Sequence, residues 1–302
     1  MAHLTPARGA TQAPKGVEPT SGAVRVAPSV TWRLLLRDRL AVASLSLLIL
    51  LALAAILAPF LAAHAPSHID LKQAALPPGP GHPMGTDLLG RDVWSRALYG
   101  GRVSLAVGLS AAAIAALLGV ILGMAAAYRG GWVDAVVTRL VDAALAMPAF
   151  FLLVAVQSIL GPGVANVILM VSLVGWMVVA RVVRALTISL KEREFVLAAR
   201  ALGCSAPRIV LRHLVPNLAG QVGVLFALGV ADALLLESAL SFLGMGVPLT
   251  EPSWGNMLND AQAAILSGAW WIAAFPGMLV LGTALAINLV GDGIQEMLTP
   301  RS

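Results

Sequence analysis

Two carboxylates stand at the end of a long uncharged run, where they could act on a polar or charged substrate inside a membrane. Asp232 and Glu237 follow the apolar stretch 214–231. Charged side chains are costly in a bilayer, so those that persist often line a pathway. The alternative is that both lie near the membrane surface and are solvated. We take Asp232, Glu237, Gln221 and Asn166 as candidates for pathway lining, although amides in membranes more commonly bond between helices.

Three histidines, His64, His68 and His82, share one segment that is rich in proline and glycine. Imidazole is a common metal ligand. Pro66 lies between the first two histidines and disfavours a helix that would place them as an i,i+4 ligand pair. We therefore expect solvated loop histidines and no metal site.

Motifs for other kinds of chemistry are missing from the sequence. A phosphate-binding P-loop requires Gly-Lys-Ser/Thr, and none of the three lysines, Lys15, Lys72 and Lys191, follows a glycine. Neither HExxH nor GxSxG occurs, and the single cysteine, Cys204, cannot form a zinc-binding cluster alone. We expect a chain that is not an enzyme and that binds no cofactor itself.

The composition is that of an integral membrane protein. Hydrophobic residues make up 59% of the chain and charged residues only 12%, against about a quarter charged in soluble domains. Mean hydropathy is +0.87. The formal charge of +5 comes from basic residues beside apolar runs, which indicates membrane orientation and contact with lipid rather than nucleic acid.

The uncharged stretches predict an all-α fold with about six transmembrane helices. A hydrocarbon core of about 30 Å needs about 20 helical residues, and lipid-exposed backbone must be helical. Gly119 and Gly123 form a GxxxG pair that favours close helix packing. The expected spans are 40–63, 103–128, 143–180 divided in two at Gly161-Pro162-Gly163, 214–231 prolonged past Asp232, and 271–291 kinked at Pro276.

Basic residues predict how the helices are oriented. Of the 20 lysines and arginines, 16 fall on the side of the two termini and of the loop 190–216, which the positive-inside rule places in the cytoplasm. We expect residues 1–30 to form a disordered cytoplasmic tail. Residues 31–100 would form the first span and an extracytoplasmic loop, and residues 101–296 the main transmembrane domain.

The loop segment Glu194–Asn217 is a polar island whose residues predict a helical elbow. Gly203 suits the left-handed position after a helix end. Ser205 can cap a second helix and Pro207 is tolerated in its first turn. Pro216 marks the entrance to the next span.

Ala198 and Ala199 would leave a flat patch for a partner, rimmed by arginines. Arg208 and Arg212 lie one helical turn apart on one face. An elbow joined to a spanning helix can transmit movement from a soluble partner into the bundle. The alternative is an ordinary basic loop.

The pattern Leu197-Ala-Ala-x-x-x-Gly203, followed after nine residues by His213-Leu-Val-Pro216, resembles the EAA loop of permease subunits in ABC importers. Leu197 stands where that family has glutamate, and Glu194, nearly one turn earlier, is a partial substitute. Further segments resemble the dipeptide/oligopeptide/nickel class: 85–96, 99–104, 130–134, 139–142, 241–246, 252–258 and 288–293.

This resemblance implies an inner-membrane permease subunit with the type I ABC importer fold and cytoplasmic termini. Its partners would be a second homologous permease subunit, two cytoplasmic ATPase subunits or domains that hold ATP and Mg, and an extracytoplasmic binding protein. The implied ATPase-coupling residues are Glu194, Leu197, Ala198, Ala199, Arg200, Gly203, Pro207, Arg208, Arg212, His213 and Pro216.

Di- or oligopeptides are the expected substrates, with nickel or a glutathione-like peptide as alternatives within the same family. A second class of function is a secondary transporter driven by an ion gradient. Such a transporter would favour carboxylates at mid-membrane and broken helices in paired repeats. An intramembrane enzyme would need a catalytic dyad within the spans, and none is visible.

Overall fold

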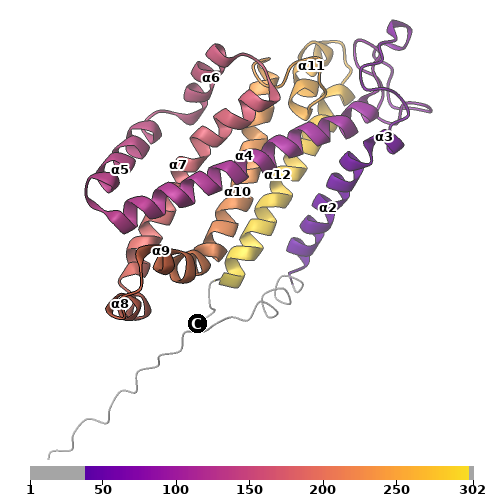
Figure 1. The fold of residues 1–302 in the computed structure, drawn as a ribbon. Coiled ribbons are helices and arrows are strands. Elements are labelled where there is room, and N and C mark those ends of the chain that lie inside the picture. The colour runs from indigo at the N-terminus through magenta and orange to yellow at the C-terminus, as the bar shows by residue number, and fades with distance from the viewer. Residues whose placement is uncertain (1–37, 299–302) are drawn as a thin grey trace, which may run out of the picture.

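The structure, a computed structural model, describes residues 38–298. The tail expected over residues 1–30 lies outside the described residues. The described chain is a bundle of helices without strands (Figure 1). Its elements are α2 (Arg39–Ile56), α3 (Ala58–Leu61), the 3₁₀ helix η1 (Leu71–Gln73), α4 (Val93–Arg129), α5 (Gly131–Leu145), α6 (Ala149–Leu160), α7 (Val164–Lys191), α8 (Glu194–Ala201), α9 (Ala206–Ile209), the π-helix η2 (Val210–Leu214), α10 (Val215–Phe242), α11 (Trp254–Leu266) and α12 (Trp271–Leu298).

Five helices are long and apolar enough to cross a membrane, and α5 with α6 forms a sixth candidate that is bent by 92°. From the sequence we expected a single helix from residue 143 to Gly161. This was wrong, because two helices, α5 and α6, meet there at a sharp bend. Pro148 precedes α6, and a proline disfavours helical backbone at the residue before it. The chain consequently breaks between α5 and α6 as well as at Gly161–Gly163.

α4 is the axis of the bundle and begins at Val93 rather than at Val103. The Asp92 side chain accepts a hydrogen bond from Ser95 N–H and caps the helix. Arg96, in the first turns, is buried and pairs with Asp87 at 2.5 Å and Asp260 at 2.8 Å. At 37 residues α4 is about 55 Å long, so it extends beyond a hydrocarbon core of about 30 Å.

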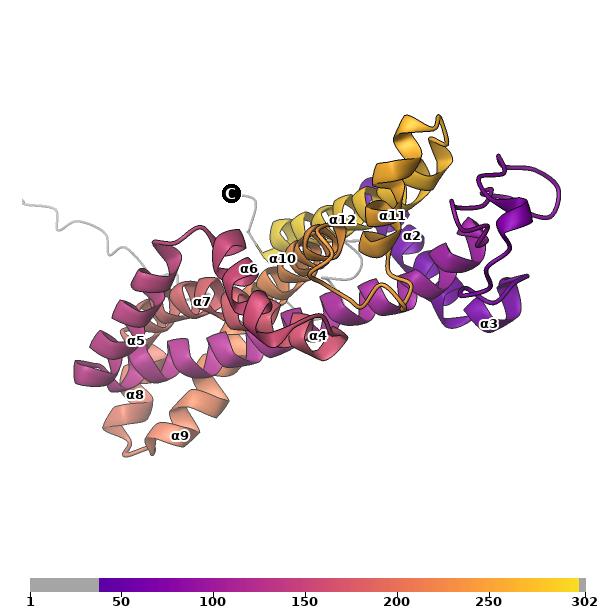
Figure 2. The same ribbon diagram turned by 90° about the horizontal axis from the view of Figure 1, so that it is seen from above.

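α4 and α7 pack closely along much of their length (Figure 2). A Cβ built on Gly119 would lie 2.5 Å from Val179 Cβ, and one built on Gly123 would lie 2.5 Å from Ala180 O. Both glycines therefore permit a backbone approach that any side chain would block. The close packing predicted from the GxxxG pair is confirmed.

The two ends of the bundle differ in what they carry. Figure 1 shows α8 and α9 at one end, together with the start of α2 and the end of α12, while residues 62–92 and α11 lie at the other. The described chain thus begins and ends at the same end of the bundle as the elbow. This is the arrangement that the distribution of basic residues predicts.

Replacing Gly123 with valine is expected to destabilise the bundle by about 1–3 kcal/mol, the usual cost of overpacking a core. The new side chain would meet the backbone of Ala180, so relief requires α4 and α7 to separate. Thermal unfolding of the purified chain in detergent measures the effect. Gly282→Val is the matched control, because a Cβ at Gly282 meets nothing within 4 Å. An equal loss of thermal stability in both variants would contradict the assigned role of Gly123.

Candidate functional site

α8 ends in a motif that turns the chain sharply. Gly203 has φ +76°, the left-handed conformation expected of it. Its N–H donates to Arg200 O at 2.9 Å, and Cys204 N–H donates to Ala199 O at 3.0 Å. These two bonds define a Schellman motif, which satisfies the last carbonyls of a helix.

α9 passes through the π-helix η2 into α10 without a break. Pro207 lies in the first turn of α9, where a missing N–H costs little. Pro216 is the second residue of α10 and follows the π-helix directly. The wide π turn gives room to the Pro216 ring, which would clash in a regular helix. Asn217 Nδ2 donates to His213 O at 2.6 Å. Ser205 occupies the N-cap position, but its side chain accepts no capping hydrogen bond, so that prediction was wrong.

The inner face of the elbow is fixed to the bundle by apolar packing. Arg200 of α8 also lies over the ring of Tyr128 in α4, with Cζ 5.3 Å from the ring centroid. These contacts make the elbow an extension of the ends of α4 and α7 rather than a free loop. The buried members of the cluster are Met124, Val179, Val183, Val196, Ala199, Ile209, Leu214 and Leu218.

The outer face of the elbow combines exposed apolar side chains with charges. Leu202 is 84% exposed, and Leu197, at the family's glutamate position, is 49% exposed. Ala199 is buried, so the flat patch predicted from two alanines contains only Ala198; adjacent residues on a helix point about 100° apart. The exposed residues include Glu194, Phe195, Leu197, Ala198, Arg200, Leu202, Pro207, Arg208, Leu211, Arg212 and Pro216.

Glu237 lies in a cage of hydroxyl groups at the other end of the bundle. Its side chain is fully buried, which excludes solvation at the membrane surface. Ser104 Oγ and Ser241 Oγ donate to it at 3.0 and 2.9 Å, and Ser238 Oγ lies at 3.4 Å. Ser104 Oγ also accepts from Trp254 N–H at 3.2 Å. The carboxylate therefore joins α4, α10 and the start of α11.

The other pathway candidates are placed differently. Asp232 is exposed and Gln221 half-buried; eleven residues, about three helical turns, separate them, so both lie on one face of α10. Asn166 Nδ2 donates to the carbonyls of Leu160 and Gly161 at 3.0 and 3.1 Å. Its amide therefore holds the turn between α6 and α7.

Two groups of functional candidates escaped the sequence analysis. Ser104 lies 133 residues from Glu237 in the chain, and no local pattern connects them. The exposed side chains of Phe195 and Leu202 did carry a signal, since large apolar residues in a polar loop indicate a contact surface.

Comparison with known proteins gives the structure a family. Residues 97–302 match the family described as "binding-protein-dependent transport system inner membrane component". Residues 29–78 match the N-terminal transmembrane domain of oligopeptide transport permease C. The chain belongs to this family of ABC importer permeases.

Curated relatives agree with this assignment over most of the chain. The permease is 40% identical over 270 residues to the dipeptide transport system permease protein DppC of Bacillus subtilis (strain 168), covering 89% of this chain and 84% of the relative. It is also 40% identical over 272 residues to a putative peptide transport system permease protein of Brucella abortus biovar 1 (strain 9-941), covering 90% and 91%. A secondary transporter is not favoured.

Removing the Glu237 side chain is expected to lower the permease's free energy of unfolding by at least about 2 kcal/mol, because an unsatisfied buried polar group costs about 1–3 kcal/mol. Glu237→Ala leaves the serine hydroxyls without an acceptor, whereas Glu237→Gln keeps an amide oxygen in place. The free energy of unfolding measured in detergent should therefore be clearly lower for Glu237→Ala than for Glu237→Gln.

Asp232→Ala is the control on the same helix, because its exposed side chain should shift stability by less than about 0.5 kcal/mol. An alanine variant at position 237 that is as stable as the unaltered protein would show that the cage contributes nothing.

Proposed function

We propose that this permease forms half of the translocation pathway of an ATP-driven importer for di- or oligopeptides in the bacterial plasma membrane. The observation that carries the substrate class is the 40% identity, over about nine-tenths of the chain, to relatives described as dipeptide and peptide permeases. Nickel or a glutathione-like peptide is the alternative within the family.

The permease would work with a second homologous permease subunit and with two cytoplasmic ATPase subunits or domains. ATP and Mg would be held by those ATPases, since none of the permease's lysines follows a glycine as a P-loop requires. An extracytoplasmic binding protein would deliver the substrate, in keeping with the family description.

The membrane orientation is part of the proposal. The excess of basic residues around the elbow and the chain termini supports a cytoplasmic position for that end. The end that carries residues 62–92 and α11 would then face the binding protein (Figure 1).

The elbow is the proposed coupling device. An ATPase would contact its outer face, where Leu197 replaces the family's usual glutamate and offers an apolar contact beside Glu194. Movement of the elbow would reach the bundle by two routes: the apolar cluster shared with α4 and α7, and the continuous helix from α9 into α10. Rigid packing makes such a displacement collective rather than local.

The pathway itself would run along the face of α10 that carries Gln221 and Asp232. An exposed carboxylate on an apolar helix is favourable only against water or a polar partner. Asp232 therefore fits a polar surface between two permease subunits and could attract the amino group of a peptide. Glu237 and Asn166 would support this surface from behind, because their polar atoms are engaged within the chain.

Gly203→Pro is expected to reduce ATP-dependent uptake to background without preventing membrane insertion. Proline requires φ near −65°, whereas Gly203 has φ +76°, and the N–H that bonds Arg200 O is lost. Ser205→Ala is the control, because the Ser205 side chain makes no capping bond. Normal transport by Gly203→Pro at a normal protein level would refute the coupling mechanism.

Proteoliposomes containing the complete transporter should accumulate a labelled dipeptide only when ATP is supplied to the ATPase side. Excess unlabelled di- or oligopeptide is expected to compete, whereas nickel ions and glutathione are not. ATP-independent uptake driven by an imposed ion gradient would contradict the proposal. Competition by nickel alone would indicate that the substrate is nickel and not a peptide.

A further inference from the structure

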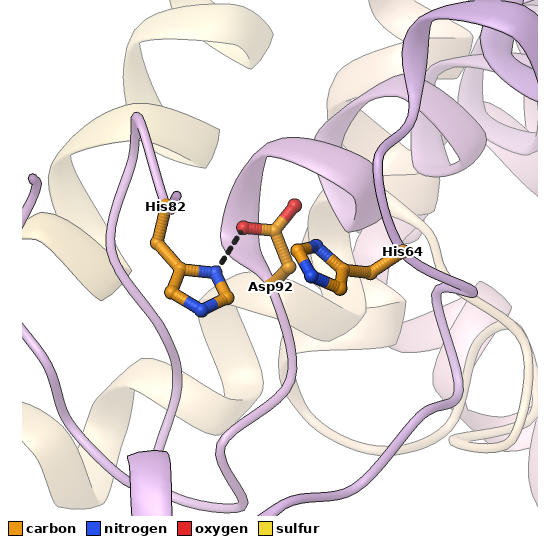
Figure 3. A group of neighbouring side chains, drawn as sticks. All are labelled: His64, His82 and Asp92. Carbon is orange, nitrogen blue, oxygen red and sulfur yellow. Dashed lines mark hydrogen bonds and ion pairs between the residues drawn. The ribbon is translucent and has the colours of Figure 1, made fainter. Parts of the chain in front are cut away.

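The loop between α3 and α4 brings two histidines and an aspartate together. His64 follows α3, His82 lies in a small hairpin closed by the Gly79–His82 bridge, and Asp92 caps α4. One ligand atom from each of the three lies within 4.8 Å of the others. Figure 3 shows both rings gathered at the carboxylate. The expectation of solvated loop histidines was therefore wrong for His64 and His82, which are half-buried, whereas His68 is exposed and outside the group.

Hydrogen bonds to neighbouring groups hold the residues of the cluster so that their possible metal-binding atoms face one another. Oδ2 of Asp92 accepts from Ser95 N and Ser95 Oγ at 2.8 and 2.6 Å, while Oδ1 lies 2.8 Å from His82 Nδ1. Nε2 of His82 lies 2.6 Å from Gln73 Oε1. The His64 backbone N–H is held by Ser95 Oγ at 3.3 Å.

His64 adds the observation that points to a ligand. Its ring stacks on that of His82 with centroids 5.0 Å apart, and its Nδ1 is buried without a hydrogen-bond partner. A buried nitrogen without a partner costs free energy. A bound ion at this position would remove that cost.

The contacts of His82 are compatible with the role of a metal ligand. If the Nε2 proton is donated to Gln73 Oε1, a neutral ring presents the lone pair of Nδ1 to the carboxylate oxygen of Asp92. Two lone pairs at this separation repel unless a proton or a metal ion lies between them. Histidines that bind metals almost always donate their other N–H to an oxygen acceptor, which fixes ring and tautomer.

We propose that His64, His82 and Asp92 form a site for a divalent transition metal ion, with Zn²⁺ as the best-fitting occupant. Two imidazoles and one carboxylate match the ligand types of zinc, and three protein ligands leave a fourth position for water. Zn–N and Zn–O bonds of about 2.0–2.2 Å place tetrahedral ligand atoms about 3.4 Å apart. The His82–Asp92 pair, at 2.8 Å, is closer than that value, and every separation in the group is at most 4.8 Å, so the ligand atoms would adjust by side-chain rotation when the ion binds.

The metal would act as a clamp on this end of the permease. It would join the chain after α3, the hairpin around His82 and Asp92, the residue before α4, and so add to the bonds that already hold residues 85–87 to the start of α4. The site involves neither the transported substrate nor the elbow, so the metal-site proposal is tested independently of the proposed function.

The test measures metal binding by the purified full-length chain, carrying a tag without histidine. A chromophoric chelator competes for Zn²⁺, and the visible spectrum of added Co²⁺ reports coordination geometry. We expect one ion per chain with a tetrahedral cobalt spectrum. His64→Ala should weaken binding by at least about tenfold, since even the loss of an outer partner costs about 10–100-fold. Gln73→Ala removes the hydrogen-bond partner of His82 Nε2 and should weaken Zn²⁺ binding by about 10–100-fold.

His68→Ala is the matched control from the same loop and should bind the ion as tightly as the unaltered chain. His64→Cys keeps a metal ligand at the position and should restore Co²⁺ binding, with a thiolate-to-cobalt charge-transfer band absent from the unaltered chain. His64→Ala removes no side-chain hydrogen bond, so the fold should persist, which circular dichroism checks. A chain that binds no ion, or equal losses in His64→Ala and His68→Ala, would overturn the proposal.

Discussion

The structure depends on the close approach of α4 and α7. With no water available in the hydrocarbon to favour burial, helices associate through packing, and small residues decide where they can meet. Gly119 and Gly123 bring α4 against the backbone and side chains of α7 around Val179 and Ala180. α10 packs against this pair and α12 packs in turn mainly against α10, while the ends of α4 and α7 support the elbow.

The elbow shows how a polar segment is made rigid without being buried. Gly203 closes α8, Pro207 occupies the first turn of α9, and the π-helix accommodates Pro216 where the helix continues into α10. The inner face adds apolar anchoring to this local geometry, while the outer face stays available. A family whose members pair with separate subunits requires such a surface, and the mixture of leucines and charges there suits a protein partner.

Polar groups in the rest of the bundle divide into those engaged within the chain and those left open. Glu237 and Asn166 find their partners inside the permease. Asp232 has no comparable enclosure and is placed where another surface could meet it. Burial and hydrogen bonding thus separate two carboxylates that are only five residues apart on the same helix.

The sequence alone determined the features that depend on nearby residues. Apolar runs identified the membrane and most spans, and the spacing of alanine, glycine and proline around residue 203 identified the elbow and its family. Gly203 and the two prolines adopt the expected conformations because their backbone preferences are local. The GxxxG pair belongs here too, since its spacing already defines a packing face.

Tertiary structure decided what depends on contacts between distant residues. Only folding brings Ser104 to Glu237, and only folding gathers His64, His82 and Asp92 from three segments of one loop. It also turned Ala199 inward while Ala198 stayed exposed, and it set the angle between α5 and α6. The physical reason is that hydrogen bonding and burial are properties of a position in space, which local spacing along the chain does not encode.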